Sequence, residues 1–549
     1  MDQATHAHDV LVEPLFAITP GNETLALTTL LARLLVGEEI QSFPNLAAEQ
    51  RGHFWRFLVR CGAKALHTRG CSVEQATRMR QGDLDTAIRD TLRNAAGDPD
   101  GSRGAWALYQ PNLMVPGFLQ PPFPPGTNPE EGVKTGSCAY LSTLTGEKCH
   151  ERKADTGRTR TPEQAALGLI ELQLGAYYGG PKNYESQITA DGYCGTPFVG
   201  ARIADSNTQT FRHDVQVLLE HWHQITEDLK LSGDVWALWT VAWDKNGGAL
   251  SAARLDPAFI PLARFVRLDR PEHGTFTSLR YWPTENPRVA EQQPGGHYGD
   301  PFASLTFDAK KGHLKVRGTQ RKGYDYREVV ELLFPERKDG LGGEVAPSVK
   351  TLQHHRHHGR PNLSVVFEGI AYKQGGTEGF HRRELVLPAS GPRRLGSPEP
   401  VRKAHGQMLK VVGNTEEAVK KAIRVLLRGE TKKGQNPPRV DPRPGADAVR
   451  HLNALLDRIY LDELFAMADR LDAGDTTWIL DWAATVRRMT WEAFEHTIAV
   501  LPLPDTRRWQ RIVVARQRLR RELTKLTPAI TTSPTRSSRQ TTPQTELPL

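Results

Sequence analysis

The chain has 549 residues, of which 38% are apolar and 24% are charged, and its formal net charge is +8. This length exceeds what one hydrophobic core usually serves, so two or three globular domains are expected, and a fibrous or wholly disordered chain is excluded. The most apolar helix-like stretch, residues 25–37, is too short to cross a membrane and contains Arg33, so no membrane span is expected.

The N-terminus and the cysteines indicate a cytoplasmic protein. The first ten residues, MDQATHAHDV, lack the basic stretch and following apolar stretch of a signal peptide. None of the five cysteines belongs to a CxxC pair: Cys61, Cys71, Cys138, Cys149 and Cys194. An odd number of cysteines without a signal sequence is typical of reduced thiols, so a cytoplasmic location is predicted.

The first 400 residues combine helical and strand patterns without regular alternation. Apolar residues recur at helical spacing in four segments, at 24–37, 51–67, 161–179 and 211–229. Shorter runs typical of strands lie at 235–243, 263–269, 303–308, 313–318 and 363–372. Long loops rich in Pro and Gly separate these segments. Residues 1–400 are therefore predicted to form an N-terminal α+β domain, and a doubly wound sheet is not expected.

The C-terminal region has the pattern of a helical bundle. Helical periodicity is clear in four segments, at 415–429, 446–471, 476–501 and 505–526, and a Pro-rich loop at 432–445 separates the first two. Residues 401–527 are therefore predicted to form an antiparallel four-helix bundle. Residues 528–549 contain few apolar side chains and are predicted to be a disordered tail.

The positive charge is concentrated in this same region. Residues 401–527 contain 24 Lys or Arg and 16 Asp or Glu, so their excess of 8 equals the net charge of the whole chain. The rest of the chain is close to neutral. This asymmetry favours a polyanionic partner for the C-terminal domain, and a solvated basic surface is the alternative.

Known catalytic motifs are absent from the sequence. There is no Walker A sequence, HExxH, GxSxG or strand-linked GxGxxG, and the carboxylates form no cluster typical of a two-metal nuclease. Four histidines in the segment HHRHH could bind a metal or serve a nuclease: His354, His355, His357 and His358. A basic loop is the favoured interpretation, so no catalytic residue, metal or cofactor is predicted.

Two glycine-rich loops carry the same kinds of polar side chain. The first, GGPKNY at 179–184, follows a helical segment, and the second lies in YKQGGTEGF at 372–380, between two strand-like runs. Glycine permits positive φ and close approach of another backbone. Lys, Asn and Gln beside the glycines add charge and amide groups. A plain turn after a helix and a plain hairpin remain the alternatives at this stage.

The order of four segments, followed by a helical C-terminal region, resembles the CasA large-subunit family of the type I-E CRISPR Cascade complex. The segments are GFLQPP (117–122), LQLGAYYGGPKNY (172–184), PAFIPLARFVRLD (257–269) and EGIAYKQGGTEGFHRRELVLP (368–388). The family's four-cysteine zinc site has no counterpart here. The segment 146–160 lies where the family has a loop that contacts the guide RNA.

The resemblance implies that the protein recognises a protospacer-adjacent motif in the minor groove of double-stranded DNA. It places Gly179, Gly180, Lys182 and Asn183 at the motif. It places Gln374 as a wedge between the DNA strands, flanked by Lys373 and Gly375. A basic finger after residue 269 is also expected, and Arg288 is the candidate for it.

The resemblance further implies a non-catalytic subunit that promotes strand opening and R-loop formation. Its expected partners are the other Cascade subunits, the CRISPR guide RNA, the target DNA and a recruited helicase-nuclease. Two alternatives stay open: a metal-dependent nuclease that uses the HHRHH histidines, and a double-stranded DNA-binding protein that acts alone. The motif that is read, the stoichiometry and the bundle face that meets the nuclease do not follow from the sequence.

Overall fold

The chain divides into two compact units in the computed structural model, Met1–Ser397 and Pro398–Leu549. The residues that the structure describes are 7–144, 158–189, 195, 197–290, 298–308, 313–334, 350–353, 363–373, 376–429, 440–475, 477–502 and 508–525. Within these ranges, no helix combines the length and apolar character that a membrane crossing requires.

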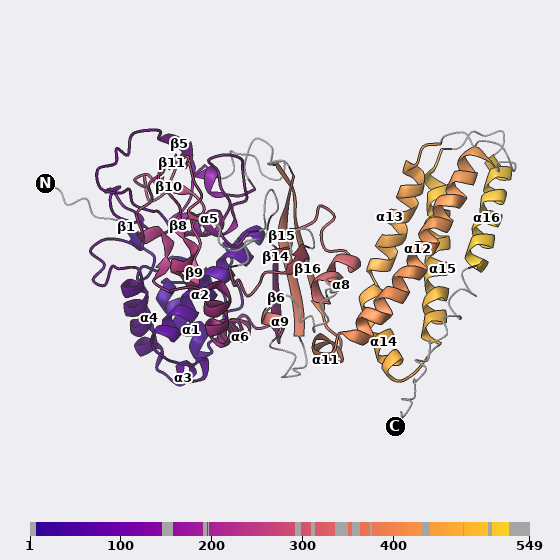
Figure 1. Cartoon of the computed structure of the whole chain (residues 1–549), viewed down its shortest axis with the longest axis horizontal. Coiled ribbons are helices and arrows are strands. Elements are labelled where there is room, and N and C mark those ends of the chain that lie inside the picture. The colour runs from indigo at the N-terminus through magenta and orange to yellow at the C-terminus, as the bar shows by residue number, and fades with distance from the viewer. Residues whose placement is uncertain are drawn as a thin grey trace, which may run out of the picture. The chain divides into compact units, whose positions relative to one another are not determined.

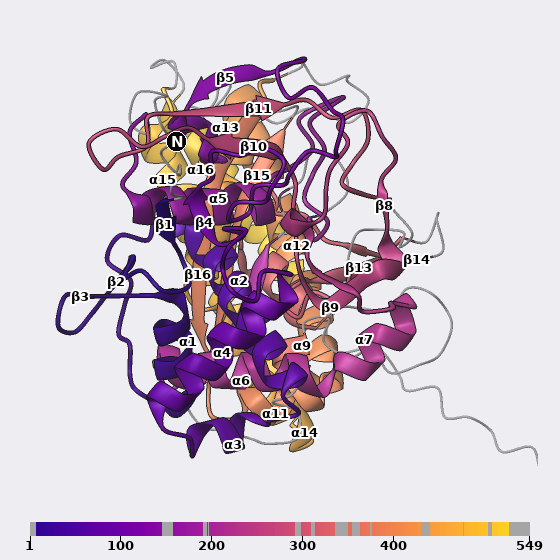
Figure 2. The same ribbon diagram turned by 90° about the vertical axis from the view of Figure 1, so that its left-hand side faces the viewer.

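The first unit contains helices of very different lengths. They are α1 (Leu27–Val36), α2 (Arg51–Thr68), α3 (Val73–Thr77), α4 (Gln81–Ala95), α5 (Pro162–Gly175), α6 (Asn207–Glu220), α7 (Trp222–Leu229), α8 (Tyr326–Leu333), α9 (Lys350–Gln353) and α11 (Gly391–Gly396). Figure 2 shows α1, α3, α4 and α6 gathered at one end of this unit, with the strands β5, β10 and β11 at the other end.

The strands of the first unit form small sheets. They are β1 (Ala7–Asp9), β2 (Phe16–Ile18), β3 (Glu23–Leu25), β4 (Ala107–Tyr109), β5 (Lys134–Ser137), β6 (Phe198–Ile203), β7 (Val235–Ala237), β8 (Leu250–Ser251), β9 (Leu255–Ile260), β10 (Phe265–Leu268), β11 (Ser278–Trp282), β12 (Val289–Ala290), β13 (Leu305–Asp308), β14 (His313–Val316), β15 (Leu363–Lys373) and β16 (Gly376–Val386). In the described residues, five sheets have two strands and two have three. The predicted α+β class is confirmed.

Helix α5 runs through the core of this unit. Its start matches the sequence prediction, because Thr161 and Gln164 form a capping box and Pro162 occupies the first turn. Every residue from Ala165 to Gly175 is buried, including the carboxyl group of Glu171. The loop that follows α5 is therefore attached to a rigid and well-packed helix.

One of the two three-stranded sheets in the described residues, of order β16-β15-β6, carries the long hairpin β15–β16, which Figure 1 shows beside β6. Strand β15 is central and pairs antiparallel with both neighbours. Strand β6 was not among the strands predicted from the sequence. All its residues except the half-buried Arg202 are buried, on both sides of the strand, so polar and apolar side chains do not alternate along it.

The second unit is helical throughout its described part. Its helices are α12 (Glu399–Arg428), α13 (Arg443–Asp457), α14 (Tyr460–Asp472), α15 (Trp478–Val500) and α16 (Arg508–Lys525). Apolar residues of α12, α13, α15 and α16 share one core cluster. The predicted helix over 446–471 is divided at Arg458–Ile459, where a turn separates α13 from α14. Tyr460 and Trp482 pack edge to face beside this turn.

Candidate nucleic-acid interface

The loop after α5 closes into a tight turn. The Asn183 N–H donates to the Gly180 carbonyl over 3.0 Å, and the Gly179 N–H donates to the Asn183 carbonyl over 2.8 Å. Gly180 has a φ of +108°, and Lys182 has a φ of +70°. With Pro181 at the second position and a positive φ at the third, residues 180–183 fit a type II turn.

The two glycines of this turn differ in their surroundings. A Cβ on Gly179 would lie 3.3 Å from the Asn183 Cβ, so Gly179 allows the two ends of the turn to approach each other. A Cβ on Gly180 would meet no atom within 4 Å, and the positive φ of this residue favours glycine. Glycine permits a positive φ at both positions, and of the two it is Gly180 that adopts one. Gly180 therefore presents bare backbone to open space.

Three contacts anchor the turn to the rest of the unit. Lys182 forms an ion pair with Glu285, and the Tyr184 hydroxyl donates to the Glu285 carbonyl over 2.8 Å. The Arg264 guanidinium donates to the Tyr177 carbonyl over 2.8 Å, and burial lowers the pKa of Arg264. The turn is therefore fixed to the segment after β11 and to the residue before β10.

The hairpin β15–β16 is paired up to its last residues. Lys373 pairs with Gly376, so the connection consists of the two residues Gln374 and Gly375. The pairing register shifts between Ala371 and Tyr372. Gln374, Gly375 and the side chain of Lys373 lie outside the described residues. The roles predicted for these three residues stay predictions.

An aromatic stack joins the glycine turn to the hairpin. The ring centres of Tyr177 and Tyr372 are 3.8 Å apart, with an angle of 27° between the rings. Both rings belong to an apolar cluster with Leu144, Ile370 and Phe380. The sequence marks the two glycine loops but not this contact. A tyrosine one or two residues before each loop was the available signal.

The environment of Arg288 corrects the prediction of a basic finger there. Its side chain is buried, and its guanidinium donates to the carbonyls of Leu238 (3.0 Å), Val241 (2.8 Å) and Ala242 (3.2 Å). The guanidinium also lies over the Trp243 ring, and burial lowers the pKa of Arg288 to about 10. A guanidinium enclosed by carbonyl groups is not available to a phosphate, so Arg288 supports the fold.

A buried arginine ties together two of the segments on which the family resemblance rests. Arg267, in β10, is almost fully buried, and burial lowers its pKa to about 9. Its guanidinium donates to five main-chain carbonyls of the segment that includes GFLQPP: Gln110, Asn112, Val115, Gln120 and Pro121. The Gln120 side chain completes the link by accepting from the Leu268 N–H over 2.6 Å.

A buried glutamine of α5 ties in the third segment. Gln173 donates to the carbonyls of Leu119 (3.0 Å) and Arg264 (2.9 Å). It accepts from the N–H groups of Ala263 and Arg264, each over 2.8 Å. The helix that precedes the glycine turn is therefore locked to both of the other segments through main-chain groups.

Many cations of the C-terminal helices form ion pairs. In α12, Lys420 and Arg424 contact Glu417, and Lys421 contacts Glu522 of α16. In α16, Arg516 contacts Glu495 and Arg518 contacts Glu522. No ion pair within the described residues involves Arg428, Arg520 or Arg521. The charge that these helices offer to a polyanion is therefore smaller than the sequence count suggests.

No group of three or more His, Cys, Asp or Glu side chains that could hold a metal ion is found among the residues that the structure describes. The histidines of HHRHH, which the sequence analysis considered as metal ligands, lie outside those residues.

Comparison with protein families identifies the chain. The family model of CRISPR-associated protein Cse1 matches residues 21–493, which include the glycine turn, the hairpin and most of the C-terminal helices. The chain belongs to the Cse1 family. This match confirms the resemblance to CasA, because CasA and Cse1 are two names for the same protein in a solved structure. No curated protein sequence matches the chain.

Solved structures share the fold of this Cse1-family chain at low sequence identity. CasA (Cse1) of Thermus thermophilus is 16% identical, with a TM-score of 0.61 over 95% of this chain and 100% of its own. Cse1 of Thermobifida fusca is 13% identical, with a TM-score of 0.63 over 96% and 99%. A chain of a CRISPR RNA-guided surveillance complex is 13% identical, with a TM-score of 0.60 over 95% and 100%.

Proposed function

We propose that this protein is the large subunit of a type I-E Cascade surveillance complex and that it recognises the protospacer-adjacent motif of target DNA. The observation that carries the proposal is the stack of Tyr177 on Tyr372. It holds the glycine turn beside the end of the β15–β16 hairpin. A surface that reads a motif and a surface that separates the adjacent base pair must lie next to each other on the protein.

The glycine turn suits the minor groove of DNA. The minor groove is narrow and offers a small set of donors and acceptors, which mainly distinguish A·T from G·C pairs. Gly180 has open space where a side chain would otherwise project, so its backbone is free to approach the base edges. Lys182 and Asn183 follow in the same turn and supply a cation and an amide for phosphate and base contacts.

The hairpin end supplies the wedge in this proposal. Gln374 enters between the strands at the first base pair beyond the motif, and Lys373 and Gly375 flank it. A carboxamide both donates and accepts hydrogen bonds, so it pairs with an exposed base edge after the base pair opens. Unstacking costs a few kcal/mol per step, and guide pairing and backbone contacts offset that cost.

The partners in this proposal are the other Cascade subunits, the guide RNA, double-stranded target DNA and a helicase-nuclease that cuts the target. The subunit itself has no catalytic role and works in the cytoplasm. The similarity to a chain of an RNA-guided surveillance complex supports the assembly. Arg428, Arg520 and Arg521 are the cations of α12 and α16 that we propose for contact with the displaced strand.

R-loop formation by the assembled complex tests the wedge. Gln374→Ala should leave assembly and motif binding unchanged and should slow strand opening, measured with a fluorescent base analogue beside the motif. Gln224→Ala is the matched control, because it removes an exposed glutamine from the surface of α7. Equal opening rates in the two variants would contradict the wedge assignment.

Two further measurements separate this function from the alternatives. A metal-dependent nuclease would cut DNA as an isolated protein, whereas the proposed subunit should show no cleavage with Mg²⁺ or Mn²⁺ until the separate nuclease is added. A DNA-binding protein that acts alone would bind duplex DNA tightly by itself. The proposed subunit should bind poorly until it is assembled with guide RNA.

A further inference from the structure

The segment after β11 is bonded to the glycine turn through main-chain groups. The Thr284 N–H donates to the Lys182 carbonyl over 3.4 Å, and the Glu285 carbonyl accepts from the Tyr184 hydroxyl over 2.8 Å. From the other direction, the Glu285 N–H donates to the Lys245 carbonyl over 2.7 Å. The segment is therefore held in place by its main chain, and the position of Glu285 does not depend on its own carboxylate.

That carboxylate pairs with the one cation of the glycine turn. Its partner is the Lys182 ammonium group, and the side chains of Lys182 and Glu285 are 51% and 49% exposed. Among the described residues, neither side chain has a second ion-pair partner. An exposed ion pair contributes little to stability, because water solvates both charges and the pair restricts two long side chains. The pair therefore opens easily when a stronger anionic partner approaches Lys182.

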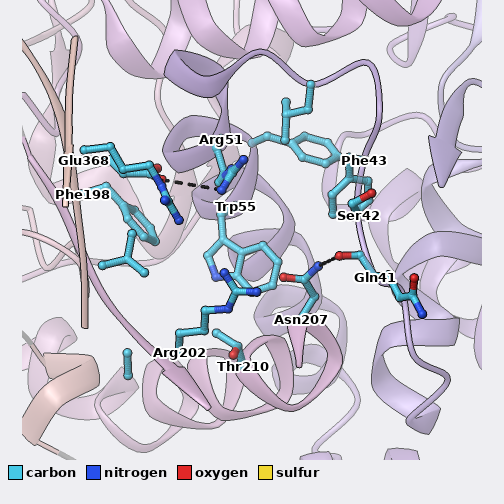
Figure 3. Close-up of a pocket in the computed structure, with 15 residues that line it drawn as sticks. Gln41, Ser42, Phe43, Arg51, Trp55, Phe198, Arg202, Asn207, Thr210 and Glu368 are labelled. Atoms are coloured by element: carbon cyan, nitrogen blue, oxygen red, sulfur yellow. Dashed lines mark hydrogen bonds and ion pairs between the residues drawn. The ribbon is translucent and has the colours of Figure 1, made fainter. Parts of the chain in front are cut away.

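Another ion pair of the same unit differs in this respect. Figure 3 shows the contact of Arg51 with Glu368 in the pocket around Trp55. The Glu368 side chain is 3% exposed and also accepts from the Arg382 guanidinium over 2.8 Å. A buried carboxylate keeps its partners, because a buried charge without a partner is strongly destabilising. The half-exposed carboxylate of Glu285 has no such constraint, so it can exchange its partner for water.

Duplex DNA is the stronger partner for Lys182 in the proposed function. It carries one negative charge per ~1.7 Å of helix axis, and a lysine that contacts a phosphate releases condensed counterions. A phosphate bound by Lys182 would lie close to the Glu285 carboxylate, within the screening length of about 8 Å at physiological ionic strength. The carboxylate therefore opposes DNA binding in two ways: it occupies the ammonium group, and it repels the phosphate.

We propose that Glu285 is a specificity-determining residue that weakens the contact of Lys182 with DNA phosphate. The inference rests on the proposed function, which places Lys182 at the DNA. A phosphate contact carries no sequence information, so weakening it shortens the time that the complex spends on unrelated DNA. A matched target is also held by pairing with the guide RNA, which this contact does not change. Glu285 therefore lowers retention on unrelated DNA more than retention on the target.

The test uses the complex assembled with guide RNA and two duplexes of equal length. One duplex matches the guide and carries the flanking motif selected from random sequences, and the other has no match. The variants are Glu285→Gln, Lys182→Gln and the double variant, each of which removes charge and keeps a side chain of similar length. Asp234→Asn is the matched control, because Asp234 pairs with Arg254 and both side chains are 49% exposed.

Affinity for each duplex is measured by fluorescence anisotropy at several salt concentrations, and dissociation is followed after adding unlabelled DNA. Thermal unfolding reports the folding of each variant. It should stay close to that of wild type, because the substitutions affect exposed ion pairs and keep the main-chain hydrogen bonds of Glu285.

Glu285→Gln should bind the unrelated duplex about three- to fivefold more tightly, with a slope of log affinity against log salt that is steeper by about one. Its dissociation from the matched target should equal that of wild type, and Asp234→Asn should equal wild type throughout. Lys182→Gln should weaken binding to the unrelated duplex. In the Lys182→Gln background, Glu285→Gln should lose most of its gain, because no ammonium group is left to release.

The outcomes distinguish this inference from the proposed function. If Lys182→Gln weakens binding while Glu285→Gln changes nothing, the role of Glu285 is overturned and the proposed function stands. An equal gain from Glu285→Gln with and without Lys182 would indicate general charge repulsion and would also overturn the inference. Unchanged binding to both duplexes in Lys182→Gln would contradict the placement of the glycine turn at the DNA, and with it the basis of the inference.

Discussion

The stack between Tyr177 and Tyr372 gives a quantitative test of how the glycine turn and the hairpin work together. Tyr177→Ala removes the ring that lies 3.8 Å from Tyr372, while Tyr177→Phe keeps it. Both variants keep the other side chains of the apolar cluster, Leu144, Ile370, Tyr372 and Phe380. Comparing the two substitutions therefore isolates the ring contact from the other properties of the position.

The size of the effect follows from the contact. Stacked aromatic pairs contribute about 0.5–1.5 kcal/mol beyond the area they bury. A half-buried ring that removes roughly 100 Å² of apolar surface from water contributes about 2.5 kcal/mol more. Because the unfolded chain already buries part of this area, Tyr177→Ala should lower the free energy of unfolding by about 2–3 kcal/mol. Tyr177→Phe should change it by less than about 1 kcal/mol.

The same contact should control strand opening in the assembled complex. A contact of 2–3 kcal/mol that holds the turn to the hairpin corresponds to roughly a 30- to 150-fold preference for the docked arrangement. Tyr177→Ala should therefore slow R-loop formation about tenfold or more at saturating target, measured by stopped-flow fluorescence, and Tyr177→Phe should not. If Tyr177→Ala lowers stability while the opening rate stays within about twofold of wild type, the coupling is refuted and the stack only supports the fold.

Three further predictions concern the stability of the first unit, measured by urea unfolding. Lys182 has a φ of +70°, which costs a non-glycine residue about 1 kcal/mol, so Lys182→Gly should be more stable than Lys182→Ala by that amount. Equal free energies of unfolding for the two variants would contradict the positive φ at this position of the turn. Burial raises the pKa of Asp214 well above 3.8, so the folded state keeps a proton that the unfolded chain releases, and the free energy of unfolding should fall as pH rises above about 4 towards the folded pKa. Asp214→Asn should flatten this fall; an unchanged slope of stability against pH would contradict a raised pKa for Asp214. A Cβ on Gly195 would lie 2.4 Å from the Ile370 carbonyl oxygen, so Gly195→Ala should destabilise by about 1–3 kcal/mol. Gly248→Ala, with no atom within 4 Å, should have little effect, and similar losses in both variants would refute the steric argument.

The parts of the fold that the sequence predicts well are those with strong local patterns. Helix α5 begins with Thr161, Pro162 and Gln164, which act together as a cap and first turn, so its start is predictable. The hairpin β15–β16 is marked by two β-rich runs around a short glycine-containing loop. In both cases the residues that determine the structure are neighbours in the sequence.

The first half of α12 was missed for a physical reason. The prediction begins at residue 415, whereas the helix begins at Glu399. Gly406 and Gly413 lie in the missed half and lower its intrinsic helix propensity. Burial of Val401, Met408 and other apolar side chains stabilises this half, and that burial depends on partner helices distant in the sequence.

In the candidate site, too, the contacts that could not be predicted are those between residues distant in the sequence. An arginine on a loop looks equally suited to phosphate binding and to a buried network, and Arg288 belongs to the second kind because carbonyls from residues 238–242 surround it. The contact of Tyr177 with Tyr372 joins residues far apart in the chain. Neither outcome follows from composition or local spacing, since both depend on how distant loops pack.

The small sheets and long loops of the first unit explain why contacts between residues distant in the sequence determine its structure. Its described sheets are small, so main-chain groups in the long loops cannot all be paired by strand ladders. Buried polar side chains form hydrogen bonds with these main-chain groups instead. Arg267 satisfies five carbonyls of one loop. Gln173 satisfies four main-chain groups, one at Leu119 in that same loop and three at Ala263 and Arg264 in another.

These side chains also determine where the glycine turn lies. Gln173 is in the helix that leads to the turn, and Arg264, to which it is bonded, holds the Tyr177 carbonyl just before the turn. The position of Gly180 therefore depends on a network of side chain to main chain hydrogen bonds rather than on a sheet edge. Such a network depends on the hydrogen-bonding geometry of a few side chains. A planar guanidinium or a carboxamide cannot be replaced in it by a side chain that has the same volume but different donors and acceptors.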